Sequence, residues 1–196
     1  MGGTLEREIL FTGIGGQGVQ LAAKSLATAA MREGRRVLMF GTYGGMMRGG
    51  DTDATLVIGD DSLITPPVVD SAWAAFAMHH MSWSSVGMKL RPDGFMMKNE
   101  SVFQGATNHT GPMLAMPATR IATEAGMPQA ASMVALGGFA AATGIVRLAT
   151  LLEIAEEVLP SYRRQFAEAN RKALQMGYDE VPAVLCPAWP MAEVMA

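Results

Sequence analysis

Short apolar runs alternate with glycine-rich and amphipathic segments along the first part of the chain. Residues 8–12 form an apolar run that ends at glycines, a pattern typical of a buried strand. Residues 17–32 carry an apolar stripe at helical spacing, Gly34 follows as a stop signal, and residues 37–40 are apolar again. The pattern predicts a strand, a helix and a second strand that are joined by a right-handed crossover.

The pattern continues toward the C-terminus and changes from strands to helices near residue 118. Apolar runs predict further strands at residues 54–58, 71–77, 94–98 and 114–117. Helical periodicity predicts helices over residues 79–90, 119–125, 132–143, 150–159 and 162–176. We therefore expect one Rossmann-like α/β domain of three layers over residues 1–180, with a mostly parallel sheet and a helical C-terminal part. Residues 181–196 contain three prolines, and we expect them to form an extended C-terminal arm.

Composition favours a surface that is partly covered by partners, with a core rich in small residues as the alternative. Of the 196 residues, 49% are hydrophobic and 17% are charged, whereas about 25% charged residues is usual for a soluble domain. The formal net charge of −3 gives no electrostatic reason to expect binding to nucleic acid or to an anionic membrane. The N-terminal residues contain no long apolar segment, so we expect no membrane span and a cytoplasmic location. Seventeen methionines, which are oxidisable, suit an anaerobic metabolism.

The residues that most often carry chemistry are few. Cys186 is the only cysteine, so the chain by itself cannot form a disulfide or ligate an iron–sulfur cluster. The three histidines are His79, His80 and His109. Neighbouring histidines on a helix point in different directions, and neither His79 nor His80 has a carboxylate three or four residues later. We therefore expect neither a metal site nor a catalytic residue in this chain.

Two glycine clusters are the candidate sites. Residues 13–18 read Gly13-Ile14-Gly15-Gly16-Gln17-Gly18 and satisfy the pattern G-x-G-x-x-G. Such a turn places free N–H groups at the start of a helix, where they can hold a phosphate. A dinucleotide site also needs a carboxylate after the second strand, and that strand is followed by Gly41 and Thr42. The turn therefore favours packing or anion binding, with a dinucleotide site as the alternative.

The second cluster lies in residues 41–53, which contain five glycines and show no helical or strand period. Arg48 stands here before Gly49 and Gly50, whose lack of side chains leaves the guanidinium open to approach. A guanidinium suits a carboxylate, a phosphate or a partner chain. The alternative is a solvated arginine in a flexible loop.

Together, the two clusters resemble the gamma subunit of 2-oxoacid:ferredoxin (acceptor) oxidoreductases. The resemblance extends along nearly the whole chain, through residues 54–58, 133–137 and 143–144 and the closing helix with Asn170, Ala173 and Gly177. The chain departs from the family pattern at Ser132, where an Asn is expected, and at Met46-Met47 before the arginine.

The resemblance implies a complex that converts a 2-oxoacid and coenzyme A into an acyl-CoA, CO2 and two electrons for ferredoxin or another acceptor. It places thiamine diphosphate, Mg and 4Fe-4S clusters on alpha, beta and delta-type subunits, so the gamma subunit holds no cofactor alone. Contacts with coenzyme A, another anion or a partner are expected from the two glycine clusters: Gly13, Gly15, Gly16, Gln17, Gly18, Arg48, Gly49 and Gly50. The alternative function is an independent Rossmann-type enzyme that binds NAD(P) or another nucleotide.

Overall fold

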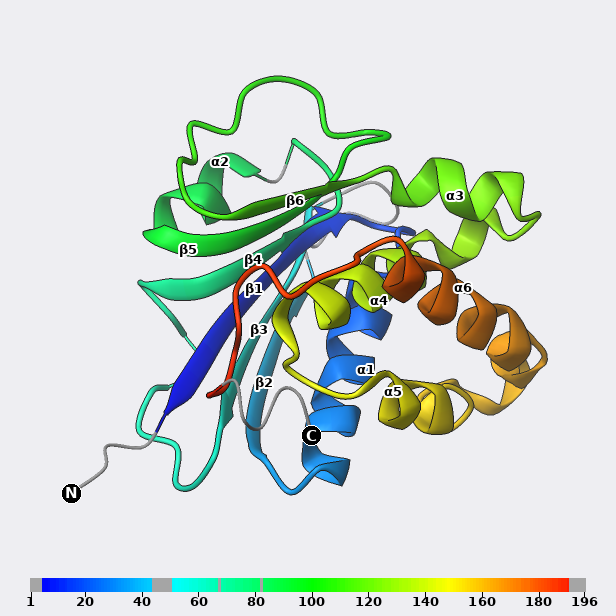
Figure 1. The fold of residues 1–196 in the computed structure, drawn as a ribbon, viewed down its shortest axis with the longest axis horizontal. Coiled ribbons are helices and arrows are strands. Elements are labelled where there is room, and N and C mark those ends of the chain that lie inside the picture. Colours follow the sequence, from blue (N-terminus) through cyan, green and yellow to red (C-terminus); the bar gives the residue numbers. More distant parts are fainter. Residues whose placement is uncertain (1–4, 44–50, 67, 82, 191–196) are drawn as a thin grey trace.

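The computed structural model describes residues 5–43, 51–66, 68–81 and 83–190. A six-stranded sheet forms its centre (Figure 1), with the strand order β2-β3-β1-β4-β5-β6. The strands are β1 (Glu6–Ile14), β2 (Arg36–Tyr43), β3 (Asp51–Gly59), β4 (Ala72–Ala77), β5 (Leu90–Asn99) and β6 (Met113–Met116).

Five of these strands run in one direction and β3 runs in the other. The pairs β1–β4, β4–β5 and β5–β6 are parallel, whereas β3 is antiparallel to both β1 and β2. The expected α/β domain with a mostly parallel sheet is therefore confirmed. The predicted strand–helix–strand unit is present as β1, α1 (Val19–Arg32) and β2, but its two strands are not neighbours, because β3 lies between them.

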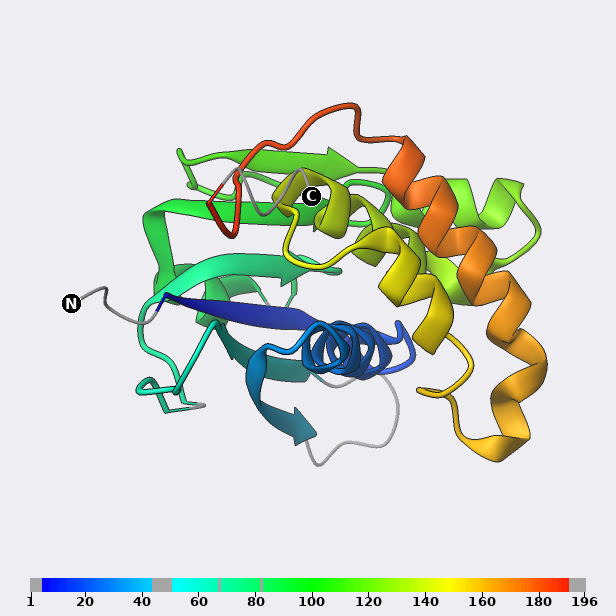
Figure 2. The ribbon, with the colours of Figure 1, turned by 60° about the horizontal axis from the view of Figure 1, so that its bottom comes forward.

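Most of the helices cover one face of the sheet (Figures 1 and 2): α1, α3 (Ala118–Glu124), α4 (Ala131–Thr143), α5 (Leu148–Ile154) and α6 (Ala167–Asp179). Every residue of α4 is buried. Its close contact with α6 requires glycine at two positions. A Cβ on Gly137 would lie 2.0 Å from the Leu174 carbonyl oxygen, and a Cβ on Gly177 would lie 1.8 Å from the Val134 carbonyl oxygen. The family-like residues of α4 and α6 thus serve close helix packing.

The opposite face, here called the open face, has a thin layer made of α2 (Trp83–Val86), the 3-10 turn η1 (Gly87–Lys89) and loops. The predicted helix over residues 79–90 is wrong for most of its length. Leu90 already belongs to β5, where it pairs with Ala72, and the His79 ring accepts a hydrogen bond from the Met81 N–H before α2 begins. Strand pairing and this local contact override the helical periodicity of the segment.

The C-terminal helices also differ in detail from the prediction. A six-residue 3-10 turn, η3 (Ser161–Phe166), precedes α6 where the periodicity predicts one continuous helix. Residues 181–190 contain no helix or strand. Within them, Trp189 is buried and donates a hydrogen bond from Nε1 to the Ile145 carbonyl oxygen at 2.9 Å. The domain boundary at residue 180 stays a prediction, and residues 191–196 lie outside the described part.

Candidate functional site

The first glycine cluster forms the turn between β1 and α1, at the carboxyl end of a central strand. From this point the chain passes through α1 to β2 on one side of β1, whereas β4 and β5 lie on its other side. Ligands of open α/β sheets bind outside the carboxyl ends of the strands where the strand order changes direction in this way. The glycine turn therefore occupies the position in the fold where a ligand is expected.

Gln17 closes this turn from within. Its Oε1 accepts a hydrogen bond from the Ile14 N–H at 3.0 Å, and its own backbone N–H donates to the Ile14 carbonyl oxygen at 3.2 Å. Its Nε2 lies 3.4 Å from the carbonyl oxygen of Met78, directly after β4. One amide side chain thus connects the carboxyl ends of β1 and β4.

The glycines of the turn have different physical roles. A Cβ on Gly13 would lie 2.7 Å from Cγ2 of Val19, and a Cβ on Gly18 would lie 2.5 Å from Oγ of Ser132. Gly18 and Gly16 also have positive φ angles, +75° and +100°. Gly16 is exposed and has open space around it. Packing thus explains Gly13 and Gly18, whereas backbone conformation alone explains Gly16.

Backbone donors for an anion are present on this turn. Among the described residues, the N–H groups of Gly16 and Gly18 donate no hydrogen bond. The first N–H groups of α1 follow directly, and Gly18 caps the helix without a side-chain contact. Such a row of N–H groups at a helix N-terminus binds phosphate or carboxylate oxygens.

Ser132, where the chain departs from the family pattern, lies against this turn. Its side chain is 1% exposed, and it stands in the first turn of α4 beside Gly18. The family resemblance led us to expect an Asn at position 132. Because 114 positions separate Ser132 from Gly18, the sequence gave no sign that the two residues lie side by side. The fold brings the substitution to the candidate site.

The geometry is unsuited to the dinucleotide alternative. In a dinucleotide-binding unit, the second parallel strand lies beside the first and ends in a carboxylate that binds the ribose. Here β3 lies between those strands. In addition, Gln20 lies close to the end of β2, since a Cβ on Gly41 would lie 2.7 Å from the Gln20 Oε1. The Nε2 of Gln20 donates a hydrogen bond to the Asp53 carbonyl oxygen at 2.7 Å. A glutamine from α1 thus lies against the last part of β2, the strand that would carry the ribose-binding carboxylate.

The strands on either side of the second glycine cluster meet at the same end of the sheet. Residues 44–50, with Arg48, Gly49 and Gly50, lie outside the described part of the chain. The strands on either side are placed, with Tyr43 of β2 opposite Thr52 of β3 and Asp51 of β3 opposite Ile14 of β1. The segment therefore starts and ends at the edge of the sheet that carries the glycine turn. This proximity depends on antiparallel β3, which the sequence pattern did not reveal.

The remaining chemical candidates contribute no metal site or reactive thiol. In the described segments, no group of three or more His, Cys, Asp or Glu side chains could hold a metal ion. Burial raises the pKa of the Cys186 thiol, and the nearby Arg7 guanidinium opposes that effect. The expectation that His79 and His80 point in different directions is wrong, because the segment is not helical and their rings stack at 4.5 Å. None of the described helices is both long and apolar enough to cross a membrane.

Comparisons with known proteins agree with the fold and with the family resemblance. A family model for pyruvate ferredoxin/flavodoxin oxidoreductase matches residues 8–180. Pyruvate synthase subunit PorC of Methanothermobacter thermautotrophicus is 32% identical over 179 residues, which cover 89% of this chain and 95% of that protein. The 2-oxoglutarate synthase subunit KorC of Methanothermobacter marburgensis is 32% identical over 181 residues, covering 88% and 95%. The solved gamma subunit of a keto/oxoacid ferredoxin oxidoreductase from Geobacter sulfurreducens superimposes with a TM-score of 0.75 and 26% identity, covering 89% and 98%.

Proposed function

We propose that this chain, which belongs to the pyruvate ferredoxin/flavodoxin oxidoreductase family, is the gamma subunit of a 2-oxoacid oxidoreductase complex. The observation that carries the proposal is the match over residues 8–180, supported by the similarity to a solved gamma subunit over 98% of its length. The complex converts a 2-oxoacid and coenzyme A into an acyl-CoA and CO2, and releases one proton and two electrons. Ferredoxin or a related acceptor takes the electrons.

The catalytic centre of this complex belongs to other subunits. A 4Fe-4S cluster needs four cysteine thiolates, and this chain has one cysteine. The magnesium that accompanies thiamine diphosphate prefers clustered oxygen ligands, and the described residues contain no such group. The residues of this chain thus do not fit these groups. We assign the groups to alpha, beta and delta-type subunits, and the complex to the cytoplasm.

The identity of the oxoacid is set outside this chain. The pyruvate synthase subunit and the 2-oxoglutarate synthase subunit are each 32% identical to it. Subunits from enzymes with different substrates are therefore equally similar to this chain. Sequencing the genes for the accompanying catalytic subunits would identify the substrate class.

Reconstitution tests the assignment. The purified chain alone should be colourless and should not reduce a dye acceptor with any 2-oxoacid and coenzyme A. Co-expression with the alpha, beta and delta-type subunits should give a complex that contains this chain and catalyses the reaction. Oxoacid oxidation by the isolated chain, or a fully active complex that excludes it, would overturn the proposal.

Within the complex, the glycine turn and Arg48 contact an anion, either a phosphate of coenzyme A or a carboxylate of a partner subunit. The free N–H groups of Gly16 and Gly18 support this role, as does the position of the ends of segment 44–50 beside Ile14. A charge-assisted contact shielded from water contributes about 1.5–3 kcal/mol. Arg48→Lys keeps the charge but loses the two-pronged guanidinium contact.

Arg48→Ala should therefore weaken either assembly or coenzyme A binding by about 10-fold or more, with Arg48→Lys intermediate. Size-exclusion chromatography of the complex measures the first effect, and a coenzyme A titration of its activity measures the second. Lys172→Ala, at an exposed position on α6, is the matched control. If Arg48→Ala behaves like this control in both assays, Arg48 has no role in anion contact.

The alternative of an independent NAD(P) enzyme makes a separate prediction. Since β3 separates β1 from β2 and Gln20 contacts the end of β2, NAD(H) should bind weakly or not at all. Fluorescence titration with NADH measures this directly. Saturable micromolar binding that is lost in Gly15→Ala would favour the alternative.

A further inference from the structure

A second group of cation-bearing side chains lies at the carboxyl ends of β4 and β5, beside the glycine turn. Lys98 of β5 is half-buried and stands opposite Ala77 of β4. Phe95 and Met97 belong to the core on the helical face, whereas Met96 belongs to a cluster on the open face. Side chains alternate along a strand, so Lys98 shares the open face with Met96.

The ammonium group of Lys98 has no polar partner in the described part of the chain. It forms no ion pair and donates no hydrogen bond to a described residue, and it lies 5.9 Å from the centroid of the Phe103 ring. A half-buried ammonium has three donors to satisfy, and withdrawing a charge from water without a partner is unfavourable. Lys98 therefore has the capacity to bind an anion.

His79 and His80 extend this group of basic side chains. The His80 ring lies edge-on to Phe103 at a centroid distance of 6.3 Å and stacks on His79 at 4.5 Å. Phe103 thus contacts both His80 and Lys98. No carboxylate forms an ion pair with any of the three basic residues among the described side chains.

The hydrogen bonds of the two rings leave their outer nitrogens available. Nδ1 of His79 accepts a hydrogen bond from the Met81 N–H at 3.2 Å, so neutral His79 carries its proton on Nε2. Nδ1 of His80 lies 3.2 Å from the Val102 carbonyl oxygen, to which it donates. Neither Nε2 contacts a described polar atom. Burial, and then the neighbouring His80, lower the pKa of His79, as expected for rings without a counter-charge.

We propose that Lys98, His79 and His80 bind a phosphate group at the carboxyl ends of β4 and β5. Lys98 Nζ and the Nε2–H of neutral His79 supply donors, and His80, whose Nδ1–H is given to the Val102 carbonyl oxygen, adds an Nε2–H donor when its ring carries both protons. Three such donors suit the three free oxygens of a phosphate ester better than the two of a carboxylate. The site is distinct from the glycine turn but adjacent to it, because Gln17 lies against the carbonyl oxygen of Met78, the residue before His79. A ligand with more than one phosphate group can contact both places.

The experiment follows the imidazole signals of the full chain by NMR at constant ionic strength. Inorganic phosphate, ADP and coenzyme A are titrated separately, with sodium chloride as the salt control. The signals of His79 and His80 should shift with each phosphate compound, while the signal of His109, whose Nε2 is engaged with the Gly94 carbonyl oxygen, should not. Tighter binding of ADP and coenzyme A than of phosphate would identify a nucleotide-type ligand, and equal affinity would identify a site for free phosphate.

Two variants decide whether the site is built as proposed. Lys98→Met keeps the apolar stem and removes the charge, so apparent phosphate affinity should fall about tenfold, the loss of one charge-assisted contact of about 1.4 kcal/mol. Lys172→Met, at an exposed position on α6, should leave affinity unchanged. Absence of shifts at His79 and His80 with every phosphate compound, or equal affinities in the two variants, would overturn the proposal. This readout does not depend on assembly with other subunits.

Discussion

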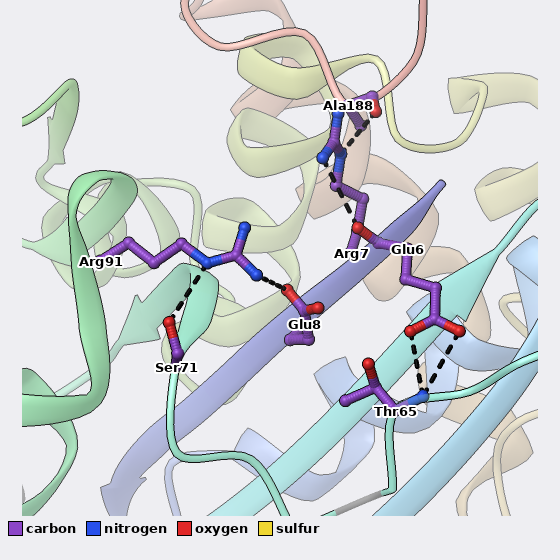
Figure 3. Close-up of polar contacts among 7 residues, drawn as sticks. All are labelled: Glu6, Arg7, Glu8, Thr65, Ser71, Arg91 and Ala188. Carbon is purple, nitrogen blue, oxygen red and sulfur yellow. Dashed lines mark hydrogen bonds and ion pairs between the residues drawn. The ribbon is translucent and has the colours of Figure 1, made fainter. Parts of the chain in front are cut away.

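The two ends of the central sheet differ in whether their polar groups have partners within the protein. At the carboxyl ends of β1, β4 and β5, the backbone N–H groups of Gly16 and Gly18 and the ammonium of Lys98 have no hydrogen-bond partner among the described residues. At the amino ends of the same strands, charged side chains are paired with the protein itself (Figure 3).

Consecutive charged residues of β1 show this pairing. Glu6 accepts hydrogen bonds from the backbone N–H groups of Ile64 and Thr65. The Arg7 guanidinium lies over the Trp73 ring at 5.0 Å and donates to the Ala188 carbonyl oxygen at 2.6 Å.

Glu8 is the most buried of these residues. Its carboxylate is 2.7 Å from the Arg91 guanidinium, with side-chain exposures of 7% for Glu8 and 37% for Arg91. Arg91 also contacts Ser71 Oγ through its Nε at 3.3 Å. These contacts join the start of β1 to the start of β5 and to the residue before β4.

The difference distinguishes an end of the sheet whose charged groups are paired internally from the end that carries the proposed sites. Buried polar groups cost free energy unless they are paired, so an end of the sheet that serves stability alone pairs them internally. Donors without a protein partner at the other end are available to a ligand or partner that supplies acceptors. Charged residues alone therefore do not mark the site; unpaired donors do.

The largest effect is expected from breaking the amino-end ion pair. Arg91→Met leaves the buried Glu8 carboxylate without its partner, and should lower the free energy of unfolding by about 3–4 kcal/mol. Urea denaturation measures the change. The matched control is Arg120→Met, because the Arg120–Glu124 pair is exposed at 61% and 63%, and it should cost less than about 1 kcal/mol. If the two variants lose equal free energy of unfolding, the Glu8–Arg91 ion pair stabilises the fold no more than an exposed pair does.

A somewhat smaller effect is expected within the glycine turn. Gly18→Ala should cost about 2–3 kcal/mol, because φ is +75° and the new Cβ would lie 2.5 Å from Ser132 Oγ. Gly16→Ala, with positive φ but open space, should cost about 1–2 kcal/mol.

Ser132→Ala tests the reason for this difference, since it removes the Oγ atom that the new Cβ would meet. Combined with Gly18→Ala, it should recover the packing part of the loss and leave the backbone part. Additive effects in a double-mutant cycle would contradict the contact between the turn and α4.

The smallest effects are expected from pH, and they fall in different ranges at the two ends. The pKa of folded His79 is lowered, so the unfolded chain binds more protons, and stability should fall as pH drops below about 6.5. Burial raises the pKa of Glu6, but hydrogen bonds with Thr65 and Ile64 outweigh that effect, so the pKa of the folded protein is lowered. Its contribution to stability should persist above about pH 4.5 and be lost as pH falls further.

Thermal unfolding between pH 3 and pH 8 separates the two contributions. His79→Gln should flatten the decline near pH 6, whereas Glu6→Gln should flatten only the acidic part of the curve. Identical curves for these variants and the unaltered chain would show that neither shift is coupled to folding.

Local patterns predicted most of the fold because they arise from neighbouring residues. The apolar runs marked all six strands within a few residues, and the helical periodicity located α1, α3, α4 and α6. It failed over most of residues 79–90, because α2 spans only Trp83–Val86 and Leu90 already pairs with Ala72 as the first residue of β5. The glycine turn was also found from sequence, since G-x-G-x-x-G describes a local change from strand to helix.

The sequence by itself determined the elements, the glycine turn and the family resemblance, all of which depend on residue type and short spacing. Only the tertiary structure decided that β3 lies between β1 and β2, because strand order depends on pairing between distant segments. It also placed Ser132 against Gly18 and Lys98 near the ring that His80 contacts. Which donors remain unpaired depends on every neighbour in space, so no sequence spacing could reveal it.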